Sequence, residues 1–168
     1  MDVIEAIKTR RSVRLFSDRD IEQEKLDRIA DAGRLAPTAR NEQRCRAVFI
    51  KDRKTVENIA KACDRYSWVA TAPVIIAIYA DNDRKMMCGQ SSKTVDCSIA
   101  MSFMMLEATE LGLGSVWMGH FDADAVKKAI GVPEEYVLAA IMPVGYPADG
   151  GEPKEKLPRD CLLYTSPS

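Results

Sequence analysis

Histidine is nearly absent from this chain of 168 residues, and its scarcity excludes several kinds of active site. His120 is the only histidine, so a Ser-His-Asp triad or a two-histidine metal site would need it or lack a member. The alternative is a loop histidine with no catalytic task. Neither G-x-x-x-x-G-K-[ST] nor G-x-G-x-x-G after a strand occurs, which excludes a P-loop and a Rossmann dinucleotide site.

Cysteine is present, but it lacks the spacing of a disulfide framework or a zinc site. The five cysteines are odd in number, scattered along the chain, and never form a C-x-x-C pair. We therefore expect reduced structural thiols. They are Cys45, Cys63, Cys88, Cys97 and Cys161.

An excess of one charge and a long apolar run are also missing. Twenty-four basic and twenty-five acidic side chains give a net charge of -1 and a pI near 5.9. No overall charge draws the molecule toward nucleic acid, and no apolar run approaches the roughly 18 residues of a membrane span. The first predicted helix carries charges where a signal peptide needs an apolar core. These features predict a cytoplasmic protein that binds neither nucleic acid nor membrane.

What is present is a mixture of helix and strand patterns with enough hydrophobic residues, 46%, to bury one core. Asp2 and Asp52 are placed to cap helices, and the β-branched run at 72–80 is typical of a strand covered on both faces. The prediction is a layered α+β fold in a single domain, residues 1–160, followed by an atypical tail, 161–168. Helices are predicted over residues 2–9, 20–35, 52–63, 94–112 and 122–130, and strands over 47–50, 72–80, 115–118 and 136–144.

The segment 94–112 is apolar nearly all round, which predicts a long helix buried centrally or against a partner. Met101, Met104 and Met105 on it are interpreted as filler of the core or of a dimer interface rather than as a ligand site.

A basic cluster follows the first predicted helix directly. Arg10, Arg11 and Arg14 offer planar forks of donors that match phosphate oxygens, and the Ser12 hydroxyl adds a directional bond. The alternative interpretation is a solvated basic face.

Four separated motifs occur together in the order and spacing of one family. They are residues 10–14 (RRSVR), 35–43 (LAPTARNEQ), 106–119 (LEATELGLGSVWMG) and 144–147 (VGYP). Over residues 2–159 the chain resembles the FMN-dependent nitroreductase family. The resemblance implies a three-layer fold with a central, mostly antiparallel sheet flanked by helices, and a long central helix at a dimer interface.

The resemblance also implies an activity and its cofactors. We expect a homodimer with two FMN molecules, each bound between the subunits, and NADH or NADPH as electron donor. Hydride would pass through flavin N5 in a ping-pong cycle to a small electron acceptor: a nitroaromatic, a quinone, a flavin or an activated alkene. The alternatives are a flavin-storage protein of the same fold with little turnover, and a module that binds nucleic acid or a partner through the arginine cluster.

Site residues follow by position from the same resemblance. Arg10, Ser12 and Arg14 would hold the FMN phosphate and ribityl chain, with Arg11 assisting or facing solvent; Arg159 would also contact phosphate. The ring would be lined by Pro37, Thr38, Ala39 and Asn41, by Gln43 as a weaker candidate, and by the backbone of Val116, Trp117, Met118 and Gly119. No catalytic side chain and no metal is expected.

Simpler roles remain open for some of these residues. Pro37 could only end a helix, Asn41 could only form a turn, and Trp117 is interpreted as a packing residue of its strand. The group that stabilises reduced flavin is unassigned among Arg11, Asn41, Lys93 and Arg159. The chain departs from the family at Arg44, where proline is common, and in its tail; the segment 79–94 is expected to form a variable lid.

Overall fold

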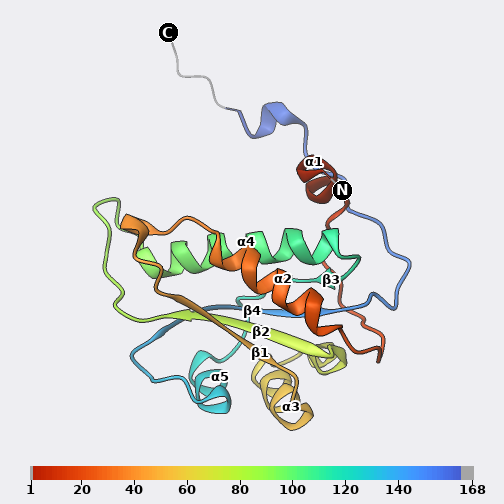
Figure 1. Ribbon diagram of the computed structural model, residues 1–168, viewed down its shortest axis with the longest axis horizontal. Coiled ribbons are helices and arrows are strands. Elements are labelled where there is room, and N and C mark those ends of the chain that lie inside the picture. The colour runs from red at the N-terminus through yellow and green to blue at the C-terminus, as the bar shows by residue number, and fades with distance from the viewer. Residues whose placement is uncertain (1, 164–168) are drawn as a thin grey trace.

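A computed structural model describes residues 2–163, which form five α-helices and a four-stranded sheet (Figure 1). The tail 161–168 predicted from the sequence therefore lies largely outside the described residues. The helices are α1 (Val3–Thr9), α2 (Gln23–Arg34), α3 (Arg53–Ala62), α4 (Ser92–Glu110) and α5 (Ala123–Ile130); the strands are β1 (Cys45–Ile50), β2 (Val74–Ala80), β3 (Gly114–Ser115) and β4 (Val137–Gly145).

The sheet has the order β1-β2-β4-β3, and every neighbouring pair is antiparallel. Alternate residues of β2 face opposite sides, because successive side chains of a strand point to opposite faces. Ile76 and Ile78 join a core with α2 and α4, whereas Ile75 and Ala77 join a second core with α3 and α5. The two helix layers lie on opposite sides of the sheet in Figure 1, as the three-layer prediction requires.

The predicted helix caps are confirmed. Asp2 accepts a hydrogen bond from the Glu5 amide at 2.8 Å, and Asp52 accepts one from the Thr55 amide at 2.9 Å. The second helix begins at Gln23, three residues later than the predicted 20. The preceding residue, Glu22, does not cap the helix with its side chain. Its carboxylate accepts hydrogen bonds from the Tyr146 hydroxyl and from Arg19 instead.

The predicted strand 115–118 is shorter in the structure. β3 ends at Ser115, and pairing resumes at Met118, which bridges to Ile141 of β4. The Val116 amide still donates to the Pro143 carbonyl at 3.3 Å, but proline has no N–H to return the bond. This missing donor explains the interruption.

Helix α4 is buried along most of its length, and all three methionines predicted as filler lie in the core. Gly33 of α2 lies against Met104 of α4: a Cβ there would come within 2.1 Å of the Met104 Cε and force that flexible side chain to move. Phe103, by contrast, faces outward.

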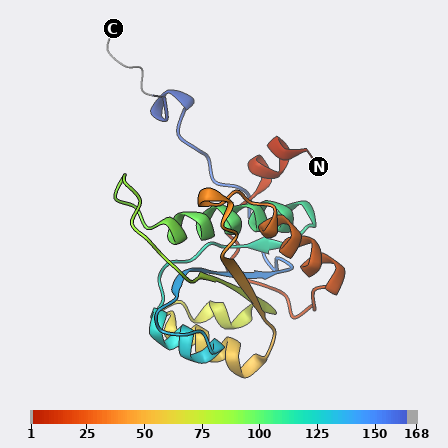
Figure 2. The same ribbon diagram turned by 60° about the vertical axis from the view of Figure 1, so that its left-hand side comes forward.

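Two segments extend from this body. Residues 81–91 form a small hairpin, closed by a bond from the Met86 amide to the Gln90 carbonyl, that stands out beyond the N-terminal end of α4 (Figure 2). Residues 148–163 run past α1 and away from the sheet. Within residues 2–163, no helix combines the length and hydropathy that crossing a membrane requires.

All five cysteines are free thiols. Cys63 and Cys97 are buried and Cys45 is half-buried, as expected of structural thiols, but Cys88 and Cys161 are exposed. The Sγ atoms of Cys45 and Cys97 lie 3.5 Å apart.

Candidate functional site

The arginine cluster lies along the outer edge of the sheet. Ser12 forms a parallel bridge with Ser115 of β3, and the Val13 amide donates to the Ser115 carbonyl at 3.0 Å. Gly114 permits this approach, because a Cβ there would lie 2.5 Å from the Val13 side chain. The fold therefore brings the cluster beside the start of the segment 116–119.

The cluster opens into a cavity of about 280 Å³. Arg11 is paired there with Asp149, through an Nη1–Oδ2 distance of 3.1 Å and an Nη2–Oδ1 distance of 2.5 Å. This pair lowers the pKa of Asp149 and satisfies the Arg11 guanidinium. The cavity is lined by Arg10, Arg11, Ser12, Arg14, Asp149, Glu152, Lys154 and Lys156.

Lys154 and Lys156 were missed by the sequence reasoning, which assigned the C-terminal phosphate contact to Arg159. Their alternate spacing places both on one side of an extended segment, and that spacing was the available signal. Arg159 lies in a short, exposed 3-10 turn and does not line the cavity within the described chain. Its contact with phosphate stays a prediction.

The second predicted group, residues 37–43, is a loop between α2 and β1. The Ala39 amide donates to Asp96 Oδ1 of α4 at 2.8 Å, and the Gln43 amide donates to the Thr38 hydroxyl at 3.0 Å. Arg40, Asn41 and Gln43 have φ angles of 55°, 54° and 53°, in the left-handed region. Pro37, Asn41 and Gln43 are exposed.

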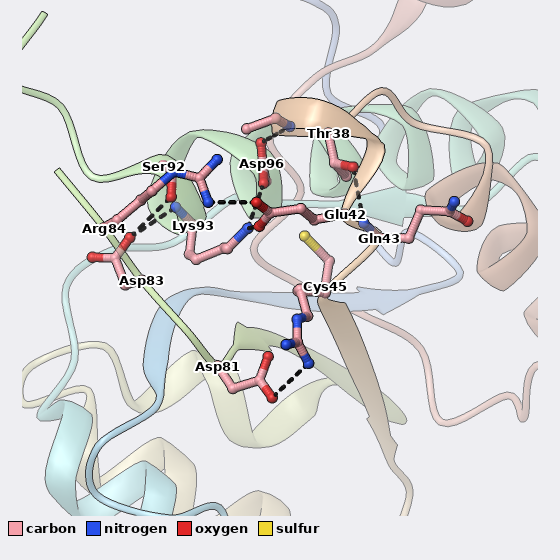
Figure 3. A network of polar contacts seen from close by, with 12 residues as sticks. Thr38, Glu42, Gln43, Cys45, Asp81, Asp83, Arg84, Ser92, Lys93 and Asp96 are labelled. Atoms are coloured by element: carbon pink, nitrogen blue, oxygen red, sulfur yellow. Dashed lines mark hydrogen bonds and ion pairs between the residues drawn. The ribbon is translucent and has the colours of Figure 1, made fainter. Parts of the chain in front are cut away.

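A group of four charged residues, which we call the Lys93 cluster, lies beside and partly within this loop (Figure 3). The Lys93 Nζ lies 2.6 Å from Glu42 Oε2 and 3.3 Å from Asp96 Oδ2. Arg84 Nη1 lies 2.5 Å from the other Glu42 oxygen. The cluster is Glu42, Arg84, Lys93 and Asp96.

Two residues of the Lys93 cluster, Glu42 and Lys93, have shifted pKa values. Hydrogen bonds from Lys93 and Arg84 lower the pKa of Glu42 to about 2. Burial lowers the pKa of Lys93, but the hydrogen bonds with Glu42 and Asp96 outweigh it and raise that pKa overall. The Lys93 side chain is 0% exposed, and its ammonium pairs with these two carboxylates.

The third predicted group is the segment 116–119. Val116 and Met118 are buried, whereas Trp117 is 41% exposed and Gly119 is exposed. The Trp117 ring lies over Gly119, where a Cβ would be 3.1 Å from it. Val116 and Met118 are therefore packing residues of this segment, whereas the Trp117 ring lies at the surface.

The predicted residues gather at two places rather than one. Arg10 contacts the Met105 sulfur at 3.9 Å near the C-terminal end of α4, whereas Ala39 is bound to Asp96 near its N-terminal end. Nine residues of helix separate these two contacts by about 13 Å. The arginine cavity and the loop 37–43 thus lie toward opposite ends of α4.

The architecture defines a class: three-layer α+β proteins with a four-stranded antiparallel sheet and a long helix across it. A nitroreductase family protein from Clostridium difficile, solved as a crystal structure, has this architecture. It matches with a TM-score of 0.86 and 29% identity, over 100% of both chains.

Sequence comparison then identifies the family. The model of the nitroreductase family matches residues 7–65 and 64–146, and the chain belongs to this family. A Methanothermobacter thermautotrophicus protein whose name includes NAD(P)H nitroreductase is 35% identical over 153 residues, covering 89% of this chain and 79% of the relative. A Bacillus subtilis protein named FMN reductase (NAD(P)H) is 27% identical over 189 residues, covering 97% of this chain and 73% of the relative.

Proposed function

We propose that this nitroreductase-family protein is an FMN-dependent NAD(P)H oxidoreductase that reduces a small electron acceptor. The arginine cavity carries the proposal, because it offers a phosphate-binding surface beside the segment 116–119. The names of relatives agree, since they include FMN reductase and NAD(P)H nitroreductase.

The cavity residues fit the phosphate end of FMN. With Arg11 taken by Asp149, the cationic side chains lining the cavity still include Arg10, Arg14, Lys154 and Lys156. The Ser12 hydroxyl adds a donor. The buried hydroxyl of Ser115, next to Ser12 across the bridge, has no hydrogen-bond partner within residues 2–163. Ser115 does not line the cavity, so its hydroxyl is not counted among the donors to phosphate.

Bound FMN would supply hydride chemistry that no side chain provides. The loop 37–43 would line the ring, with the exposed Asn41 amide offering both a donor and an acceptor to its polar edge. The backbone of residues 116–119 would cover another part of it. One open face of the ring would serve donor and acceptor in turn, as in a ping-pong cycle.

We further propose that the site is completed in a homodimer. In one chain the arginine cavity and the loop 37–43 lie apart along α4. A second copy that brings its own loop 37–43 to this cavity would complete the site. The apolar surface of α1 supports a homodimer too: Val3 is 70% exposed, Ile4 and Ile7 are also exposed, and Leu35 and Phe103 lie on neighbouring elements. Exposed apolar surface of this kind marks interaction sites.

The visible absorption spectrum of the purified protein, followed anaerobically after addition of NADH and then NADPH, tests the function. We expect flavin bands that bleach within seconds and thereby identify the donor. Arg10→Ala with Ser12→Ala should lose FMN while the fold is retained. Bands that persist would indicate a flavin-storage protein, and a colourless protein that refuses added FMN would contradict the proposal.

A further inference from the structure

Three segments that are distant in the sequence meet at the Lys93 cluster. Glu42 comes from the loop 37–43, Arg84 from the hairpin 81–91, and Lys93 and Asp96 from the first turns of α4 (Figure 3). The Lys93 amide also donates to Asp83 of the hairpin at 3.0 Å. One buried ammonium therefore lies where the loop, the hairpin and the helix join.

The loop is anchored at two points, on either side of Arg40 and Asn41. Ala39 is held through its amide by Asp96, and Glu42 is held through its carboxylate by Lys93 and Arg84. Between them lie Arg40 and Asn41, which have positive φ angles without being glycine. Such backbone conformations persist only where the surroundings enforce them.

Both anchors depend on the charge of Lys93. Asp96 is 3% exposed and uses one oxygen for the Ala39 amide and the other for the Lys93 ammonium. Without that ammonium, a buried carboxylate would lose its counter-charge, and Glu42 would keep only Arg84. The charged groups that face Lys93 and its amide are Glu42, Asp96, Asp83 and, through Glu42, Arg84.

We propose that Lys93 is a positioning residue for the candidate flavin loop: with Asp96 and Glu42 it fixes the loop 37–43 in the shape that meets the flavin ring, and it ties this loop to the hairpin 81–91. This inference rests on the proposed function. It gives Lys93 a role through Glu42 and Asp96 rather than through contact with the cofactor.

Glu42→Gln in the full-length protein is the main test, because Glu42 is only partly buried and Lys93 keeps Asp96 in this variant. The matched control is Glu22→Gln, which removes another ion-paired carboxylate, at the other end of α2. Amide hydrogen exchange of residues 38–43 should accelerate about tenfold in Glu42→Gln and stay unchanged in Glu22→Gln, as expected for loss of a charged hydrogen bond.

Flavin binding supplies the readout that separates positioning from general weakening. Glu42→Gln should weaken FMN and riboflavin by the same factor, about tenfold, because the loop would act on the ring. Arg14→Ala should weaken FMN alone, since riboflavin has no phosphate. At saturating FMN, bleaching of the flavin by the reduced nicotinamide should also be slower in Glu42→Gln but not in Glu22→Gln. The flavin-free chains of both variants should lose thermal stability to a similar extent, because both carboxylates stabilise the fold while ionised.

Lys93→Met extends the test: in a variant whose circular dichroism shows a native fold, loop exchange should be faster and flavin binding weaker than in Glu42→Gln. The inference about Lys93 would be overturned, and the proposed function would stand, if the wild type binds FMN but Glu42→Gln matches it in loop exchange or in flavin affinity. Wild-type protein that binds no flavin would contradict the proposed function, and the positioning role would fail with it.

Discussion

At the scale of the residue, two surface carboxylates show how contacts set ionisation. A hydrogen bond from the Tyr146 hydroxyl, with help from Arg19, lowers the pKa of Glu22 to about 2, and Lys93 with Arg84 does the same for Glu42. In both cases the folded state binds its proton less readily than the unfolded chain, whose ordinary value is 4.5. Such groups stabilise the fold only while they are ionised.

These lowered pKa values determine how the free energy of unfolding changes at acidic pH. The stabilisation from Glu22 and Glu42 should be complete above about pH 4.5 and should be lost as the pH falls toward 2. Urea unfolding at a series of pH values measures it. Glu22→Gln and Glu42→Gln should each flatten the dependence between these values, whereas Glu57→Gln, an exposed glutamate on α3, should leave it as in the wild type. The same dependence of stability on pH in all three variants would contradict the stabilisation assigned to Glu22 and Glu42.

At the scale of the element, the contact between residues 12–13 and β3 depends on a glycine. A Cβ on Gly114 would lie 2.5 Å from Val13 Cγ2 and 2.8 Å from its Cβ, and a branched side chain at this position has little freedom to move aside. The strand pairing that presents Ser12 and Arg14 therefore depends on the missing side chain.

Gly114→Ala should consequently lower the free energy of unfolding by about 1–3 kcal/mol, the usual cost of overpacking. It should also weaken FMN binding, because the arginine cluster is displaced. Gly150→Ala is the control, since a Cβ there meets nothing within 4 Å; it should change stability by less than about 0.5 kcal/mol. Chemical denaturation with FMN titration measures both variants. A Gly114→Ala protein as stable as the control would show that residues 12–13 shift without cost.

The same scale shows what the sequence could and could not predict. The run of β-branched residues identified β2, and Asp2 and Asp52 identified two helix starts, because these patterns act within a few residues. The Lys93 cluster was not predicted as a unit: Glu42 and Lys93 are 51 positions apart, and only the fold makes them neighbours. Lys154 and Lys156 were not predicted, because the family resemblance implied a phosphate contact in this segment only at Arg159.

At the scale of the whole molecule, the proposed homodimer would bring together two halves of the candidate site. One chain separates its arginine cavity from its loop 37–43 along α4, and it exposes apolar side chains on α1. The family resemblance predicted two FMN molecules, each bound between the subunits, but sequence order carries no information on which copy supplies which half of a site.

Disruption of the α1 surface should separate the copies. Ile4→Glu places a charge on an exposed apolar face and should convert a dimer to a monomer at micromolar concentration, with loss of bound FMN. Light scattering after size exclusion measures the mass. Met87→Glu alters another exposed apolar residue, on the hairpin, and should remain dimeric. A wild-type protein that elutes as a monomer and still binds FMN would contradict the homodimer.

The bridge between Ser12 and Ser115 has a consequence for solubility. β3 would otherwise end the sheet with unpaired backbone groups, which invite a strand of another molecule. Residues 12–13 cover that edge, and the arginines beside them charge it, which is a common protection against edge-to-edge aggregation. The residues proposed to bind phosphate would thus also protect the newly folded chain from aggregation before it binds a cofactor.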